Sequence, residues 1–120
     1  MDLVTEVTTH LEIDQEDAVG ALGALLTAVR FGVDAQTFEM LKDAIPQARS
    51  FLDNAAARSA RTSEIVALTT PESLARRLRG AGHTDESIRK LGNIVREAVR
   101  KTVPPEAAER VVDAINRALP

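Results

Sequence analysis

The stretch "VGALGALLTAV", residues 19 to 29, carries no charge and holds Gly20 and Gly23 inside a pattern that otherwise predicts a helix. A glycine in a helix interior costs about 1 kcal/mol relative to alanine, so its presence needs a physical reason. A second stretch, "IRKLGNIVREAV" at 88 to 99, places Gly92 after a leucine in the same way. We therefore expect Gly23 and Gly92 to mark close helix–helix crossings.

The composition is that of a soluble all-α domain. The chain has 120 residues, of which 44% are hydrophobic and 28% charged, and its aromatic residues are three phenylalanines. It has no cysteine, which excludes disulfides and thiolate chemistry. No segment shows the alternating pattern of a strand. We expect one domain over residues 1–120, a compact bundle of six or seven short helices.

Start and stop signals divide the chain into helices. Asp14, Asp34 and Thr84 are typical N-cap residues, and Thr70-Pro71 is a strong helix start. The stretch "SARTSEIVALTT" is the least regular, and we expect a flexible connection at about 57–69. The expected helices cover residues 2–11, 15–31, 35–45, 46–61, 71–80, 85–101 and 105–119.

The two halves of the chain are similar to each other. Residues 14–45 align with residues 84–115 when one extra residue is allowed in the second copy, and Leu22-Gly23 then falls on Leu91-Gly92. Such a match predicts an internal repeat, with two related helical hairpins that share a core and pack across the two glycines.

The expected helix at 15–31 has no charge between residues 18 and 29, even on the face turned away from its leucines. A helix that is small or apolar all round is normally buried. Either it is the central helix, covered by the helices at 2–11 and 46–61, or it meets another subunit. The second alternative predicts a partner-binding surface for an unknown protein or a second copy, formed by Gly20, Gly23, Ala24 and Thr27.

Residues for catalysis or for metal binding are scarce. Glu6, His10 and Asp14 have a nominally metal-like spacing, but no H-x-x-x-H or H-E-x-x-H motif accompanies them. The acids at 14, 16 and 17 are typical of a helix start. We therefore expect a non-enzymatic interaction module with no catalytic residue, no cofactor and no metal.

Residues 74–99 suggest an alternative function. They predict a helix, a glycine turn and a capped helix, which resembles the helix-turn-helix of DNA-binding proteins. Against a nucleic-acid-binding regulator stand three acids in and beside the second helix and an overall pI of about 5.4. The residues expected to contact nucleic acid are Arg76, Arg77, Arg89, Lys90, Asn93, Arg96 and Arg100.

Charge is divided unevenly along the chain. Residues 1–55 hold 3 basic and 10 acidic residues, a formal charge of −7, whereas residues 56–120 hold 12 and 8, a charge of +4. Either the halves face each other, or the basic half meets an acidic partner, or the difference lies on solvated faces. The acidic start and the short uncharged run at 18–29 predict a cytoplasmic protein without a membrane span.

The segments "GALGALL" (20–26), "FEMLKDAIPQARSFLDNAA" (38–56) and "GHTDESIRKLGNIV" (82–95) are similar to small bacterial helical proteins of the VcgC/VcgE-like family. The resemblance spans most of the chain, although residues 57–70 are less glycine-rich than that family's pattern. It implies a helical fold, and because the family has no established activity it implies no site residues.

Overall fold

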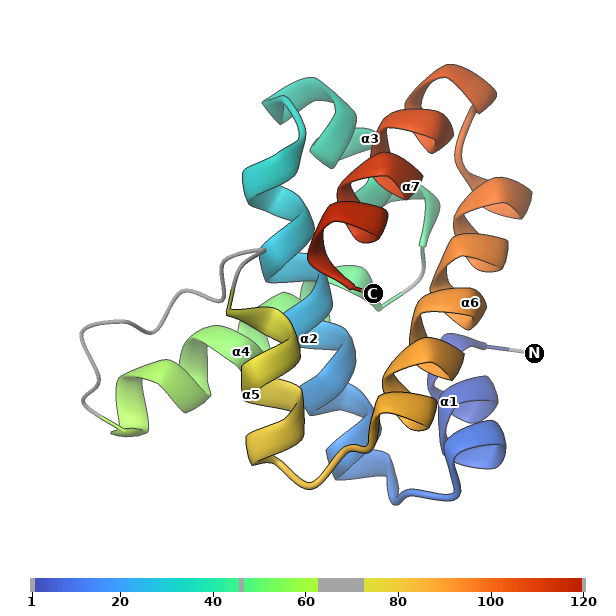
Figure 1. The fold of residues 1–120 in the computed structure, drawn as a ribbon. Coiled ribbons are helices and arrows are strands. Elements are labelled where there is room, and N and C mark those ends of the chain that lie inside the picture. The colour runs from blue at the N-terminus through green and yellow to red at the C-terminus, as the bar shows by residue number, and fades with distance from the viewer. Residues whose placement is uncertain (1, 46, 63–72, 120) are drawn as a thin grey trace.

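The computed structural model describes residues 2–45, 47–62 and 73–119, and in these ranges it confirms an all-α bundle without strands (Figure 1). The predicted helix start at Thr70-Pro71 lies outside the described residues, and the helix there is described from residue 74. The helices are α1 (Leu3–Leu11), α2 (Gln15–Gly32), α3 (Ala35–Ala44), α4 (Ala48–Thr62), α5 (Leu74–Gly80), α6 (Asp85–Thr102) and α7 (Pro105–Ala118).

The three predicted N-caps are confirmed. Asp14, Asp34 and Thr84 each accept a hydrogen bond from the backbone N–H three residues later, at 2.8, 3.3 and 3.1 Å. The hydroxyl of Ser87 in turn accepts from the backbone N–H of Thr84 at 2.9 Å, which completes a capping box. These bonds satisfy N–H groups that a helix start otherwise leaves without a partner, so the caps fix where α2, α3 and α6 begin.

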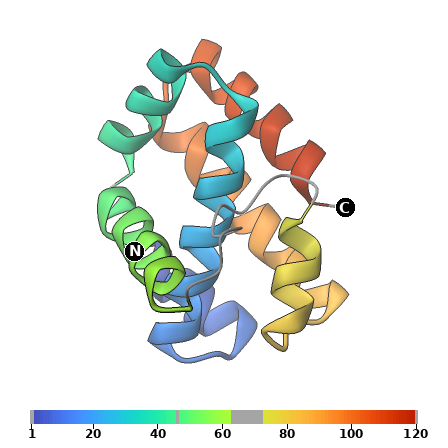
Figure 2. The same ribbon diagram turned by 90° about the vertical axis from the view of Figure 1, so that its left-hand side faces the viewer.

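Helix α2 is the central element of the bundle. It packs against α1, α3, α4, α5 and α7, whereas α6 closes the far side by packing against α1 and α7. Figure 2 shows α2 running between α4 on one side and α5 and α7 on the other. The structure therefore agrees with the first of the two alternatives for this helix, in which other parts of the same chain cover it.

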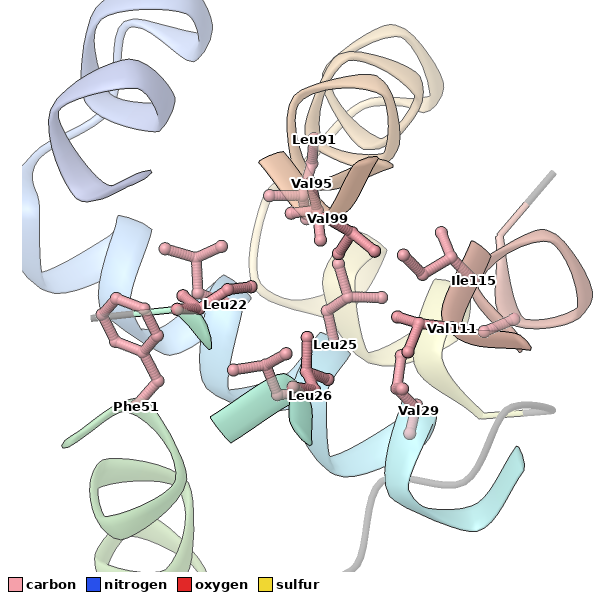
Figure 3. Packing of buried hydrophobic residues seen from close by; sticks show 14 of the residues in the cluster. Leu22, Leu25, Leu26, Val29, Phe51, Leu91, Val95, Val99, Val111 and Ile115 are labelled. Carbon is pink, nitrogen blue, oxygen red and sulfur yellow. The ribbon is translucent and has the colours of Figure 1, made fainter. Parts of the chain in front are cut away.

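The core is aliphatic, as the composition predicts. Buried side chains from one face of α2 meet those of α6 and α7, and Phe51 of α4 joins them (Figure 3). Truncating a buried leucine to alanine costs about 2–5 kcal/mol, so these side chains account for much of the stability. The labelled members of this cluster in Figure 3 are Leu22, Leu25, Leu26, Val29, Phe51, Leu91, Val95, Val99, Val111 and Ile115.

The two matched glycines have different roles. A Cβ added at Gly23 would lie 2.5 Å from the backbone oxygen of Phe51, so Gly23 marks a close crossing of α2 and α4 as predicted. A Cβ at Gly92 would instead lie 2.9 Å from a guanidinium nitrogen of Arg96 and 3.3 Å from Leu119. The prediction of a helix crossing at Gly92, and of hairpins packed across both glycines, is therefore wrong.

Two further expectations concern the middle and the halves of the chain. Helix α4 continues to Thr62, so the predicted flexible connection is helical over residues 57–62, and its remainder lies outside the described residues. Helices α2 and α6 are both 18 residues long and each leads into a second helix, which fits the proposed repeat. The repeat itself stays a prediction.

Alanine substitutions at the two glycines separate their roles. Alanine gains about 1 kcal/mol of helix propensity at either position. At Gly23 the new methyl group meets backbone, and overpacking of this kind costs about 1–3 kcal/mol, so we expect Gly23→Ala to be net destabilising. At Gly92 the methyl group meets the end of the Arg96 side chain, which can shift at the cost of its hydrogen bonds to Asn93 and Asn116, so Gly92→Ala should destabilise less than Gly23→Ala. Urea denaturation of both variants checks this, and equal losses of stability would contradict it.

The cap of α3 predicts a pH effect. Hydrogen bonding with Thr37 lowers the pKa of Asp34 below its ordinary value of 3.8, and Arg110 lowers it further. A lowered folded-state pKa means that the carboxylate stabilises the fold above about pH 3.8, and that this contribution is lost as the pH falls through the folded pKa. We expect Asp34→Ala to melt below the wild type at pH 7, with a gap that narrows below pH 3.8. Thermal melts test this, with Asp34→Asn as the control because it keeps the acceptor without the charge.

Candidate functional site

Four residues follow one line along α2, which we call the outer line, and they range from buried to exposed. The outer line consists of Gly20, Ala24, Thr27 and Phe31, at the spacing of one helical face. Gly20 and Ala24 are half-buried, and Thr27 is 9% exposed. Phe31 is 51% exposed, and among the described residues it is the one large hydrophobic side chain that is exposed.

Two of the four predicted partner-binding residues face the inside of the monomer. Gly23 is buried against α4, which packs within van der Waals distance of it. The hydroxyl of Thr27 is occupied within its own helix, because it donates a hydrogen bond to the backbone oxygen of Gly23 at 2.7 Å. The small-residue surface available to another molecule is thus narrower than predicted, and it retains Gly20 and Ala24.

Sequence reasoning missed Phe31 as part of this surface. The signal was available, because Phe31 continues the steps of four and three residues that join Gly20, Ala24 and Thr27. A phenylalanine near the end of an apolar helix normally belongs to the core, so the sequence alone does not indicate that Phe31 is exposed.

A second surface lies on α6, where Arg89, Asn93, Arg96 and Arg100 follow one line along the helix, the arginine line. Within the described part of the chain, none of these three arginines forms an ion pair. The lysines of α6 differ, because Lys90 and Lys101 each pair with a glutamate one turn earlier, at 3.5 and 3.1 Å.

Arg96 is held in place by amide oxygens. Its Nε donates to Oδ1 of Asn116 on α7 at 2.7 Å, and its Nη1 donates to Oδ1 of Asn93 at 3.1 Å. The missing side chain at Gly92 leaves room for the guanidinium beside the helix. Partial burial, and then the nearby charge of Arg100, lower the pKa of Arg96, although an arginine stays protonated at any physiological pH.

The other residues of the predicted nucleic-acid surface do not behave as a set. Arg76 on α5 is exposed, whereas Arg77 is half-buried and has an interaction of its own. At the turn into α6, Nε of Arg79 lies 2.8 Å from a carboxylate oxygen of Asp85, and Lys90 is ion-paired. The helix–turn–helix outline is present, but its basic residues are divided between paired and unpaired groups, and nucleic-acid binding stays a prediction.

The ion pairs bear on the uneven charge of the two halves. Five pairs between described residues each join partners within the same half. Two belong to residues 1–55, Lys42–Glu39 at 2.6 Å and Arg49–Asp43 at 3.3 Å. These pairs leave the difference of charge between the halves in place, so it remains a property of the surface.

The lowered pKa values of two further carboxyl groups have structural explanations. The backbone N–H of Thr5 lowers the pKa of the cap Asp2, and a hydrogen bond with Lys42 lowers that of Glu39. Nδ1 of His10 lies 2.9 Å from the backbone oxygen of Glu6 on its own helix.

Among the described residues no three His, Asp or Glu side chains lie close enough to hold a metal ion. In the same ranges no helix has the length and apolar character required to cross a bilayer.

These features define the protein as a small all-α bundle, and the outer line of α2 and the arginine line of α6 are its two candidate surfaces. The chain belongs to the family described as "Protein of unknown function VcgC/VcgE (DUF2780)", whose sequence model it matches over residues 1–104. This match confirms the resemblance found in the sequence. Comparison with curated proteins and with solved structures gave no match.

Proposed function

We propose that the protein is a helical interaction module that acts by binding rather than by catalysis, and that it associates with a second copy through the outer line of α2. The observation that carries this proposal is the 51% exposure of Phe31 at the end of a line of small residues. Exposed apolar surface gains free energy when a partner covers it, at about 25 cal/mol per Å².

The outer line fits a two-fold arrangement. Phe31 lies eleven residues beyond Gly20, which is about 16 Å along a helix. When two α2 helices cross in antiparallel fashion, the phenylalanine of each copy lies over the glycine end of the other. Small residues allow such helices to approach closely, and a surface that pairs with itself gives a closed dimer.

Sedimentation velocity tests the proposal. We expect the average mass of the wild type to rise above 12.9 kDa with concentration, and Phe31→Asp to remain at the monomer mass. The side chain of Phe31 is exposed, so its replacement should leave the fold intact, which circular dichroism can verify. The aspartate acts by placing a charge where the second copy would bury an apolar group.

Gln15→Asp is the matched control, because it adds the same charge at an exposed position at the other end of α2. It should associate as the wild type does. A wild type that stays monomeric at all concentrations would contradict self-association. If Phe31→Asp and Gln15→Asp weakened association equally, the added charge alone would explain the loss, and the role of Phe31 would be contradicted.

A further inference from the structure

We propose that the hollow between the end of α2 and helices α3 and α4 binds a small zwitterion with an apolar body, such as an aliphatic α-amino acid. The hollow has a volume of about 530 Å³, which is within the range of small-molecule sites. No residue of the outer line is part of its lining, so binding there does not depend on self-association through Phe31.

Basic residues gather in this hollow against the trend of their half of the chain. Residues 1–55 hold 10 acidic and 3 basic residues, and all the basic ones line the hollow. Three different helices carry them to this place: Arg30 lies on α2, Lys42 on α3 and Arg49 on α4. The acidic residues of the lining are Glu39 and Asp53.

Two of the three cations already have a carboxylate partner. Nζ of Lys42 lies 2.6 Å from a carboxylate oxygen of Glu39 and 5.5 Å from the centre of the Phe38 ring. A guanidinium nitrogen of Arg49 lies 3.3 Å from a carboxylate oxygen of Asp43. The hydrogen bond with Lys42, and then the charges of Lys42 and Arg49, lower the pKa of Glu39, so charges on α3 and α4 act on each other here. These pairs leave little charge for a ligand.

One cation and one anion of the lining are left over. The side chains of Arg30 and Asp53 form no hydrogen bond or ion pair with any described residue, and they do not pair with each other although both line the same hollow. A ligand that brings a negative group to Arg30 and a positive group to Asp53 would satisfy both charges through charge-assisted hydrogen bonds.

The rest of the lining supplies apolar surface. Val33 at the end of α2 and Leu52 of α4 are half-buried, and Phe38 of α3 is 6% exposed. A ligand that covers the exposed part of this surface gains about 25 cal/mol per Å². The chemical class that matches the whole lining therefore combines a carboxylate, an ammonium group and an aliphatic side chain.

A small molecule with a single charge matches the hollow less well. An anion without a positive group would be repelled by Asp53, and a cation without a negative group would be repelled by Arg30. A zwitterion meets each of these residues with the opposite charge. This balance distinguishes the hollow from the arginine line of α6, whose arginines form no ion pair within the described ranges and favour anions of any kind.

An NMR titration of the isotope-labelled full-length protein tests the proposal with three probes that share one apolar body. The probes are L-leucine, its amide, which lacks the carboxylate, and N-acetyl-L-leucine, which lacks the ammonium group. We expect L-leucine to cause saturable shifts of the backbone amides around the hollow. Each analogue should bind at least about tenfold more weakly, because each loses one charge-assisted hydrogen bond.

Two variants separate the two charges. Arg30→Gln should lower the affinity for L-leucine about tenfold without weakening the binding of the amide, which has no carboxylate to lose. Asp53→Asn should weaken the binding of L-leucine and of the amide, but not that of N-acetyl-L-leucine. Both positions are exposed, so circular dichroism should show an unchanged fold.

Arg89→Gln is the matched control, because it removes an exposed arginine that forms no ion pair with a described residue and does not line the hollow. It should bind L-leucine as the wild type does. Phe31→Asp should also bind L-leucine normally, so a failure of self-association and a failure of ligand binding are separate results.

Four results would overturn the proposal. They are the absence of saturable shifts with L-leucine, shifts confined to residues outside the hollow, binding of either analogue as tight as that of L-leucine, and equal losses of affinity in Arg30→Gln and Arg89→Gln. If N-acetyl-L-leucine bound most tightly of the three, the hollow would be a site for small anions instead.

Discussion

The arrangement of the bundle depends on the close approach of α4 to α2 at Gly23. At this point the backbone of α4 occupies space that any other residue would fill with a side chain. The approach brings Phe51 into the core beside Leu22 (Figure 3) and covers one flank of α2. It thereby buries Gly23 and limits how much of α2 another molecule can reach.

Most of the fold could be predicted from the sequence because its determinants are local. The caps at Asp14, Asp34 and Thr84 act over three residues, and helical periodicity identifies the buried faces. The roles of Gly23 and Gly92 could not be distinguished in this way. A glycine in the sequence shows only that a side chain is absent at that position. Which atoms occupy the space beside it depends on contacts between segments that are far apart in sequence.

The candidate surfaces were predicted only in part for the same reason. The sequence places Gly20, Ala24 and Thr27 on one face, but it does not reveal that α4 covers Gly23. It also groups the basic residues of α6 by type, whereas the structure separates them by partner. Lys90 is neutralised by a glutamate on its own helix, and Arg96 is held by an asparagine twenty residues away. Ion pairs one turn apart can be read from spacing, but a contact between helices cannot.

The central position of α2 also has a consequence for how the protein is made. Helix α2 is translated about 80 residues before Val111 and Ile115 of α7, which cover part of its core face. On the ribosome this face has no permanent cover until α7 emerges. The chain therefore completes this core only after α7 has been translated, and until then the leucines of α2 are exposed to chaperones and to neighbouring nascent chains.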